Sequence, residues 1–362
     1  MTNNIVLIIF SILFFIPLVL ADDNAPVPAD KSQLNRWFRQ NVQPLASRKG
    51  TLDATLVTAE ANPKTIKVRV DGSGNFKTIT DAIKSIPDGN TNRVIILLGP
   101  GNYTEKIKIE RTKPFVTFYG DPKNMPVIVY GGTAAQFGTV DSASLIVESD
   151  YFSAVNVIIA NSAPRPDGKK SGAQAVALRI GGDKASFYNC KLYGFQDTLC
   201  DDKGLHFFKD CYIEGTIDFI FGDAKSLYLN TELHVIPGDQ LALITAQARK
   251  SESSDTGFSF VHCTITGTGG IAYLGRSWMP DAKVVYAYTY MSDVVQPKGW
   301  SDNLKPETAN TVFFGEYACS GAGAKLDGRV NFTKKLTDAG AKPFLSLGFI
   351  KASYWLLPPT QI

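Results

Sequence analysis

The sequence predicts an all-β fold, a right-handed, single-stranded parallel β-helix. Residues 189–197 and 210–218 share the pattern Asn/Asp-Cys-x-Leu/Ile-x-Gly-x-x-Asp, with an offset of 21 residues at every matched position. A fixed offset of about 20 to 29 residues is typical of solenoids. Short β-like segments and turns also follow one another from residue 93 up to the C-terminal region, without a helical period of useful length. We therefore expect each turn of chain to stack on the one before it.

The expected strands are short and are separated by turn residues. They are Val94–Leu98, Lys106–Ile109, Phe115–Tyr119, Val127–Tyr130, Ser144–Val147 and Phe152–Ile159. Further on, an aromatic-x-x-Cys/Thr-x-aliphatic pattern recurs at residues 187, 208, 228 and 260. A two-sheet sandwich would give similar segments joined as hairpins. The shared register of cysteine, aliphatic residue and glycine favours parallel stacking instead.

Helices are expected at both ends of the chain. Lys31–Ser47 places Leu34, Trp37, Phe38 and Val42 on one face, and Thr78–Ile86, with Thr80 as N-cap, is expected to cap one end of the solenoid. Three short segments near the C-terminus are read as helices that pack on the outside: Lys334–Ala341, Phe344–Ile350 and Ala352–Leu357.

The N-terminus has the features of a secretory signal. The apolar run Ile5–Leu20 is followed by a small residue, and at 16 residues it is shorter than the roughly 20 needed to span a membrane. We expect a signal peptide over 1–21, an N-terminal arm and helix over 22–63 and the β-helix over 64–362. Secretion would make Asn102 and Asn331 glycosylation sites, since both lie in Asn-x-Thr sequons. A net charge of +3 without a basic run argues against nucleic-acid binding.

The five cysteines, Cys190, Cys200, Cys211, Cys263 and Cys319, cannot all pair within one chain because their number is odd. Three of them share one repeat position, which favours a buried column of thiols. A disulfide between Cys190 and Cys211 is the alternative. Their spacings match no zinc motif, and the chain has only His206, His234 and His262, so we expect no metal and no other cofactor.

Asp197 and Asp218 occupy equivalent positions of the repeat. If the two turns stack, their carboxyls are separated by roughly the 4.8 Å spacing of paired strands. Two carboxyls so close cannot both ionise easily, so one pKa rises and the other falls. Both lie among apolar residues, where an unpartnered carboxylate is costly. This arrangement suits one acid and one nucleophile.

Uncharged donors and one cation accompany the pair. Gln174 and Gln196 could donate to a developing oxyanion, although an amide ladder inside the solenoid explains them nearly as well. Arg276 could hold one aspartate ionised by a charge-assisted hydrogen bond. Trp278 offers an apolar face for a sugar ring, whereas a core position is the ordinary role of tryptophan.

Several blocks, in this order, resemble the plant pectin methylesterases: GNYTEK (101–106), GAQAVAL (172–178), GFQDTL (194–199), GTIDFIFG (215–222) and YLGRSW (273–278). The resemblance covers roughly residues 64–358, and the segments DTLCDDKG, SFVHC and WLLPP are most similar to the pollen or flower type, which includes allergens. It implies a pectin-lyase-like β-helix, hydrolysis of pectin methyl esters and secretion to the cell wall. The long inhibitory N-terminal region of many relatives is not expected here.

The resemblance also implies roles for the site residues. Asp218 would attack the ester as nucleophile, and Asp197 would protonate methanol and then activate water. Gln174 and Gln196 would stabilise the oxyanion, while Arg276 would orient Asp218 and contact substrate with Trp278. Ser144 stands where relatives have a substrate-binding threonine, and Ser277 replaces the proline of the LGRPW block. The implied partners are methyl-esterified pectin and a proteinaceous pectinesterase inhibitor, with the enzyme itself a monomer.

Other functions of a carboxylate-bearing β-helix are less well matched. An inverting polygalacturonase needs about 6.5–9.5 Å between its carboxyls, more than adjacent turns provide. A pectate lyase needs a calcium site, and Asp197, Asp201 and Asp202 could be read as one, although Arg276 would oppose a cation there. A catalytically silent β-helix that binds pectin or a protein is the remaining alternative, and methanol release separates it from an enzyme.

Overall fold

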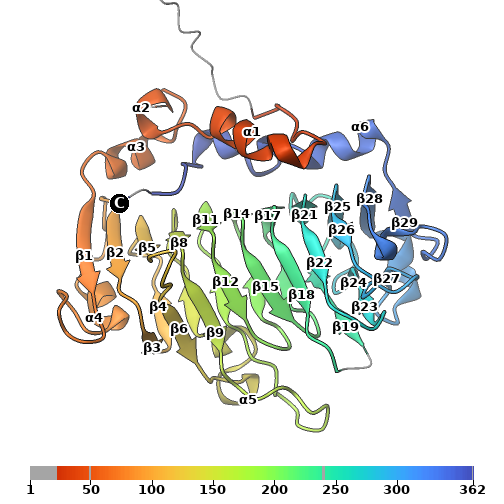
Figure 1. Cartoon of the computed structure of the whole chain (residues 1–362), viewed down its shortest axis with the longest axis horizontal. Coiled ribbons are helices and arrows are strands. Elements are labelled where there is room, and N and C mark those ends of the chain that lie inside the picture. Colours follow the sequence, from red (N-terminus) through yellow and green to blue (C-terminus); the bar gives the residue numbers. More distant parts are fainter. Residues whose placement is uncertain (1–22, 49, 239–240, 361) are drawn as a thin grey trace, which may run out of the picture.

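The computed structural model describes residues 23–48, 50–238, 241–360 and 362. Within these residues the chain winds into a parallel β-helix whose turns stack side by side along the long axis (Figure 1). The expected fold is confirmed, since strand pairing between neighbouring turns is parallel throughout the three main sheets. The alternative of a sandwich built from hairpins is wrong.

The three sheets run the length of the described molecule. The first contains β1 (Lys64–Val68), β2 (Val94–Leu98), β5 (Val116–Tyr119), β8 (Ser153–Val155), β11 (Ala185–Tyr188), β14 (Leu205–Lys209), β17 (Lys225–Leu229), β21 (Gly257–Val261), β25 (Lys283–Ala287), β28 (Phe313–Tyr317) and β29 (Thr333–Lys335). The second contains β3 (Asn102–Thr104), β6 (Val127–Tyr130), β9 (Ile158–Asn161), β12 (Lys191–Tyr193), β15 (Tyr212–Gly215), β18 (Glu232–Val235), β22 (Thr264–Thr266) and β26 (Tyr290–Met291). The third contains β4 (Ile107–Ile109), β7 (Leu145–Val147), β10 (Leu178–Ile180), β13 (Leu199–Asp201), β16 (Ile220–Gly222), β20 (Thr245–Gln247), β24 (Gly275–Ser277) and β27 (Trp300–Ser301). A short pair, β19 (Ala242–Leu243) and β23 (Ala272–Tyr273), lies between the second and third sheets in chain order.

The interior of the β-helix holds stacked side chains from successive turns. Aromatic rings of the first sheet form a ladder with centroid separations of 4.7, 4.6, 4.4 and 4.7 Å along Phe187, Phe208, Tyr228, Phe260 and Tyr286. These separations match the spacing of paired strands, so each ring packs on the equivalent ring of the next turn.

The cysteines lie free in the interior or close to it. All five are unbonded, and Cys190, Cys211 and Cys263 are buried at the same corner of the β-helix. The expected column of buried thiols is therefore confirmed, and a Cys190–Cys211 disulfide is absent. Burial raises the pKa of the Cys263 thiol to about 12, which keeps the sulfur protonated and unreactive.

A tight corner joins the first sheet to the second in the successive turns from β8 to β18. Its corner residue adopts a left-handed backbone, with φ of 57° at Asn156, 49° at Asn189, 56° at Asp210 and 53° at Asn230. Asparagine and aspartate tolerate this conformation better than most residues. The single strand expected over Phe152–Ile159 is wrong for this reason, because Asn156 bends the chain between β8 and β9.

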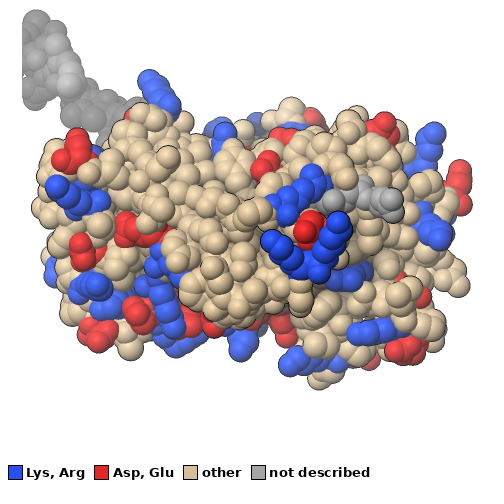
Figure 2. Space-filling view, turned by 90° about the horizontal axis from the view of Figure 1, so that it is seen from below, with Lys and Arg blue, Asp and Glu red and all other residues tan. Residues whose placement is uncertain are grey.

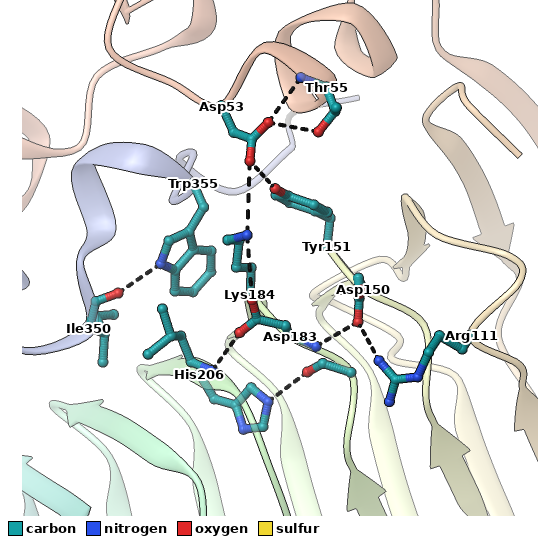
Figure 3. A network of polar contacts seen from close by, with 12 residues as sticks. Asp53, Thr55, Arg111, Asp150, Tyr151, Asp183, Lys184, His206, Ile350 and Trp355 are labelled. Carbon is teal, nitrogen blue, oxygen red and sulfur yellow. Dashed lines mark hydrogen bonds and ion pairs between the residues drawn. The ribbon is translucent and has the colours of Figure 1, made fainter. Parts of the chain in front are cut away.

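The outer face of the first sheet is covered by both ends of the chain (Figure 1). On it pack α1 (Leu34–Asn41), α2 (Leu45–Arg48) and α3 (Ala54–Glu60), together with α6 (Asp338–Ala341) and the 3₁₀ segments Lys342–Phe344, Leu347–Ile350 and Ala352–Tyr354. In Figure 3 the Tyr151 hydroxyl donates to Asp53 of the cover over 2.6 Å, and within the C-terminal part of the cover the Trp355 indole donates to the Ile350 carbonyl over 2.8 Å. The outer face of the first sheet is thus covered through both polar and apolar contacts.

The remaining helices are short. Helix α4 (Ile79–Lys84) lies at the β1 end of the β-helix, and its N-cap is Thr78, whose hydroxyl accepts from Asp81 N, rather than the expected Thr80. The expected helix at Lys334 begins instead as β29, and α6 starts at Asp338. The others are α5 (Ala134–Phe137) and the 3₁₀ segments Lys31–Gln33, Val140–Ser142, Pro306–Asn310 and Ala322–Ala324.

The expected signal peptide, residues 1–21, lies outside the described residues. Within the part of the chain that is described, no helix is both long and apolar enough to cross a membrane.

Candidate active site

Asp197 and Asp218 lie at the same corner of adjacent turns, between the second and third sheets. Asp197 follows β12 and precedes β13, while Asp218 lies between β15 and β16. The pairing of Leu199 with Ile220 preserves the 21-residue offset, and Asp197 N donates to Ile217 O over 3.0 Å. The structure therefore brings the two aspartates onto neighbouring turns.

The local backbone holds both side chains in an unusual conformation. Their φ angles are 68° at Asp197 and 50° at Asp218, in the left-handed region. The glycine three residues before each aspartate permits a close turn: a Cβ on Gly215 would lie 2.2 Å from Cβ of Phe219. The repeated glycine of the sequence pattern is thus explained by steric need, and the strain it accompanies is common at functional sites.

Arg276 binds Asp218 through two nitrogens. Its Nε donates to Asp218 Oδ1 over 2.8 Å, and its Nη2 donates to Oδ2. Asp218 is only 5% exposed and Asp197 7%, so this pairing takes place in a largely dry environment. A forked guanidinium–carboxylate contact fixes orientation as well as charge.

Arg276 reaches Asp218 from two turns further along the third sheet. On the outer face of that sheet, Phe221 of β16 pairs with Ala246 of β20, which pairs with Arg276 of β24. Ala246 is a small residue, so its side chain leaves space along the sheet for the arginine. The stacking of turns therefore brings the cation to the carboxylate.

The two carboxyls differ in their electrostatic surroundings. Burial raises the pKa of Asp197 well above its ordinary value, and the charge of Asp218 raises it further, with Arg276 acting in the opposite direction. Burial also raises the pKa of Asp218, but the charge and hydrogen bonds of Arg276 lower it. The pKa of Asp218 is therefore also raised, but Arg276 hydrogen-bonds Asp218, so the surroundings favour the proton on Asp197 and the charge on Asp218.

The two glutamines lie on adjacent turns. Ala175 N donates to Gln196 O over 3.2 Å, so the segments that carry Gln174 and Gln196 run side by side. The Gln174 amide donates to Thr139 Oγ1 over 3.1 Å. Both side chains are half-buried beside the aspartate corner, with the amide of Gln174 anchored rather than free to rotate.

Trp278 lies on the surface rather than in the core. It is 46% exposed, and the Arg276 guanidinium carbon lies 5.3 Å from the centroid of its ring. An exposed indole next to a paired arginine offers a flat apolar surface of the kind that sugar rings contact.

Ser144 lies within the β-helix wall. It is fully buried, its hydroxyl donates to Ala160 O over 2.7 Å, and Tyr130 N donates to that hydroxyl over 3.1 Å. A hydroxyl committed to backbone groups of the second sheet does not face a substrate. This placement argues against the substrate contact expected for Ser144.

Asp201 and Asp202, which with Asp197 could be read as a calcium site, point in different directions. Asp201 is buried inside the β-helix, where it lies 2.5 Å from His206 Nδ1 and accepts from the Tyr228 hydroxyl. Burial alone would lower the pKa of His206, but Asp201 raises it. Asp202 instead accepts from Arg179 on the surface. These two carboxylates therefore have structural partners of their own.

The structure adds residues that the sequence did not point to. Asn303 accepts from Arg276 Nη1 over 2.9 Å, and Thr139 accepts from Gln174. Neither belongs to a repeat or a recognisable motif, and both lie far from their partners along the chain. No signal in the sequence could have found them.

The side of the molecule that carries α5 also carries an uneven distribution of charge. In Figure 2, which views this side, several lysine and arginine side chains surround an acidic group, while a broad uncharged area lies beside them. Helix α5 is joined to the site by a hydrogen bond from Ala134 N to Gln174 O of 2.9 Å. The lower side thus presents basic groups next to a broad uncharged surface.

The chain matches known proteins along nearly all of its length. The family model described as "Pectinesterase" matches residues 65–353. "Pectinesterase 2" of Olea europaea is 64% identical over 356 residues, covering 98% of this chain and 97% of the relative. A "Pectinesterase" of Parthenium hysterophorus has the same identity and coverage.

Solved structures agree with the sequence relatives. The structure entitled "Pectin methylesterase from Carrot" has a TM-score of 0.73 and 30% identity, and the match covers 81% of this chain and 96% of that one. A pectin methylesterase in complex with a hexasaccharide has a TM-score of 0.68 and 26% identity, with 82% of this chain and all of that chain covered. The chain therefore belongs to the pectinesterase family, and it is an enzyme that hydrolyses the methyl esters of pectin.

Proposed function

We propose that Asp218 is the nucleophile of this pectinesterase and that Asp197 is its general acid and base. The observation that carries the proposal is the asymmetry of the pair. Arg276 binds Asp218 with two nitrogens, while Asp197 is buried beside a negative charge. The first arrangement favours a carboxylate, and the second favours a protonated carboxyl.

In the first half of the reaction, an oxygen of Asp218 attacks the ester carbonyl carbon of a galacturonosyl unit. The amides of Gln174 and Gln196 donate to the oxyanion of the tetrahedral intermediate. The carbon–oxygen bond to the methoxy group then breaks as Asp197 gives it a proton. Methanol leaves, and the substrate acyl group stays on Asp218 as an anhydride.

In the second half, Asp197 is a carboxylate and takes a proton from water. The resulting hydroxide attacks the acyl carbon, the bond to Asp218 breaks, and the product leaves with a new carboxyl group. Asp218 is again an anion paired with Arg276, and Asp197 again carries a proton. The cycle needs no cofactor, because protons and oxygen come from Asp197 and water.

The substrate chain is proposed to lie across the exposed face of Trp278, next to Arg276. The indole would pack against a sugar ring, and the guanidinium would approach a galacturonate carboxylate. A related enzyme whose structure contains a hexasaccharide supports a polymer of several sugars as ligand. Ser144 is left out of this surface because it is buried.

Methanol release from methylated pectin by single variants tests these roles. Asp218→Asn and Asp197→Asn are each expected to lower kcat by about 10³-fold or more, because each removes a group used in both half-reactions. Asp202→Asn is a matched control: this aspartate also accepts from two nitrogens of one arginine, since Arg179 Nη2 and Nε donate to its Oδ2 over 2.9 and 3.1 Å, but it lies outside the pair. Near-normal activity of Asp218→Asn would rule out the nucleophile assignment.

We also propose that the protein is secreted as a monomer after removal of residues 1–21, with residues 64–362 as the catalytic domain and residues 22–63 as part of its cover. The asparagines of both sequons, Asn102 and Asn331, are exposed and accessible to a glycosyltransferase. A proteinaceous inhibitor is the proposed protein partner, and the pollen or flower type is the proposed subclass. A mass decrease on enzymatic deglycosylation of secreted protein would support glycan attachment, and an unchanged mass would contradict it.

A further inference from the structure

Arg276 has a third anchor besides the two oxygens of Asp218. Its Nη1 donates to Asn303 Oδ1 over 2.9 Å, while Nε and Nη2 are used on the carboxylate. An arginine side chain has four rotatable bonds and loses considerable entropy when it is fixed. A third contact on the nitrogen opposite Asp218 restricts rotation of the guanidinium about the forked pair.

The backbone that presents Asn303 is strained. Asn303 and Leu304 both have φ of 58°, and two consecutive non-glycine residues in the left-handed region are costly. The conformation is held locally, since Asn303 N donates to Ser301 Oγ over 3.0 Å and Leu304 N donates to Asp302 Oδ1 over 3.1 Å. Leu304 itself is 96% exposed, so burial of its side chain does not offset the strain.

A buried serine ties this strained segment to the strand of Arg276. Ser277 directly follows Arg276 on β24 and is fully buried. Its hydroxyl donates to Asp302 O over 2.9 Å and lies 2.8 Å from Thr308 Oγ1. Proline, which stands here in the LGRPW block that the chain resembles, has no hydroxyl and could make neither bond.

We propose that Asn303 is a positioning residue that holds Arg276 against Asp218, and that Ser277 holds Asn303 in place. Ser277 donates to the Asp302 carbonyl, and the next residue, Asn303, accepts from Arg276. Arg276 in turn binds the carboxylate of Asp218. The inference rests on the proposed role of Asp218.

The variant Asn303→Gly tests the amide separately from the backbone. Glycine adopts a φ of 58° without strain, so the loop conformation is kept and only the acceptor is lost. With Arg276 less well fixed, Asp218 is ionised less readily. We expect kcat to fall about tenfold with little change in KM, and the acidic limb of the kcat/KM profile to move to higher pH.

Leu304→Gly is the matched control for this variant. It makes the same relief of backbone strain at the adjacent residue, and it removes no contact to Arg276. Its acidic limb is expected to coincide with that of the unaltered enzyme. If Asn303→Gly also leaves kcat and the acidic limb unchanged, Asn303 does not position Arg276.

The role of Ser277 is tested by combining substitutions. Ser277→Ala is expected to move the acidic limb in the same direction as Asn303→Gly, and the double variant to be no worse than Asn303→Gly alone, because both act through one contact. Ser259→Ala is a matched buried serine, with its hydroxyl donating to Phe344 O over 2.8 Å on the other side of the molecule. It should lose stability without any change in the pH profile. Additive effects of Ser277→Ala and Asn303→Gly would overturn the link.

Failure of this inference can be told apart from failure of the proposed function. If Asp218→Asn is inactive while Asn303→Gly behaves as unaltered enzyme, only the positioning role is wrong. If Asp218→Asn remains active, the nucleophile assignment is wrong, and the positioning role is lost with it.

Discussion

At the scale of single residues, two aspartates with nearly the same backbone have unequal chemistry. Both lie in the left-handed region and both are buried, so the repeat alone makes them equivalent. The difference comes from Arg276, which binds Asp218 and leaves Asp197 beside a negative charge. In the proposed assignment, one arginine therefore divides the pair into a carboxylate and an acid.

The burial that raises the pKa of Asp197 has a cost in folding stability that can be measured. Because burial raises the pKa of Asp197 above its unfolded value, its favourable contribution is present in acid and is lost as pH rises through the folded pKa. Asparagine does not titrate, so Asp197→Asn should raise the Tm at neutral pH by about 2–4 °C. The gain should shrink toward acidic pH. Asp202→Asn, on the surface, should show no such gain, and a lower Tm for Asp197→Asn at neutral pH would contradict this account.

At the scale of the element, the corner between the first two sheets decides where each strand ends. Asn189 has a φ of 49°, and its amide donates to Asn156 Oδ1 over 2.8 Å, so equivalent corners on adjacent turns are bonded to each other. The same residue thus relieves backbone strain and links two turns. A residue at position 189 that neither tolerates the left-handed backbone nor bonds the adjacent turn should weaken the stacking of the turns.

Substitutions at this corner separate the two effects. Asn189→Gly loses the amide contact, at about 1 kcal/mol, but keeps a permitted backbone. Asn189→Ala loses the contact and also strains the corner, so it should be less stable than Asn189→Gly by about 1–2 kcal/mol. Urea unfolding midpoints of the two variants measure this difference. Equal midpoints would show that the left-handed corner carries no strain.

At the scale of the whole molecule, the N-terminal and C-terminal segments together cover the outer face of the first sheet. Arg48, at the end of α2, is 3% exposed and donates to three carbonyls of the C-terminal segment, those of Ala352, Ser353 and Leu356. The N-terminal and C-terminal parts of the cover are therefore joined to each other as well as to the sheet. The aspartates lie on another side, away from this contact.

Removal of that arginine should loosen the cover without affecting catalysis. Arg48→Ala leaves three carbonyls without their donor and is expected to cost about 2–4 kcal/mol of unfolding free energy. Methanol release at 25 °C should stay within about twofold, because the site is held by other contacts. Arg111→Ala, which removes an exposed ion pair with Asp150, should cost less than about 1 kcal/mol. A tenfold loss of activity in Arg48→Ala would show that cover and site are coupled.

The sequence predicted those parts of the molecule that repeat. The offset between Asp197 and Asp218 placed two carboxyls on adjacent turns, because strand stacking converts a period in sequence into a distance in space. The sequence predicted the ends of strands less well. Asn156 divides one expected strand into β8 and β9, because an asparagine inside a β-like segment is only a weak sign of a corner.

Contacts between distant segments were beyond the sequence. Asn303 is 27 residues from Arg276 and lies in a segment whose conformation depends on several local hydrogen bonds. Ser144 shows the opposite case, since the matched position in the pattern gave no information about whether its hydroxyl faces outward or into the wall. Direction and long-range partnership follow from packing, which one sequence does not display.

The distance along the chain between Asp218 and Arg276 has a consequence for biosynthesis. These partners are separated by 58 residues, and the arginine belongs to a turn formed two turns later. A nascent chain that has emerged only as far as β20 holds both aspartates but not the cation that divides them. With the roles proposed for Asp218 and Arg276, catalytic competence requires translation to continue past β24.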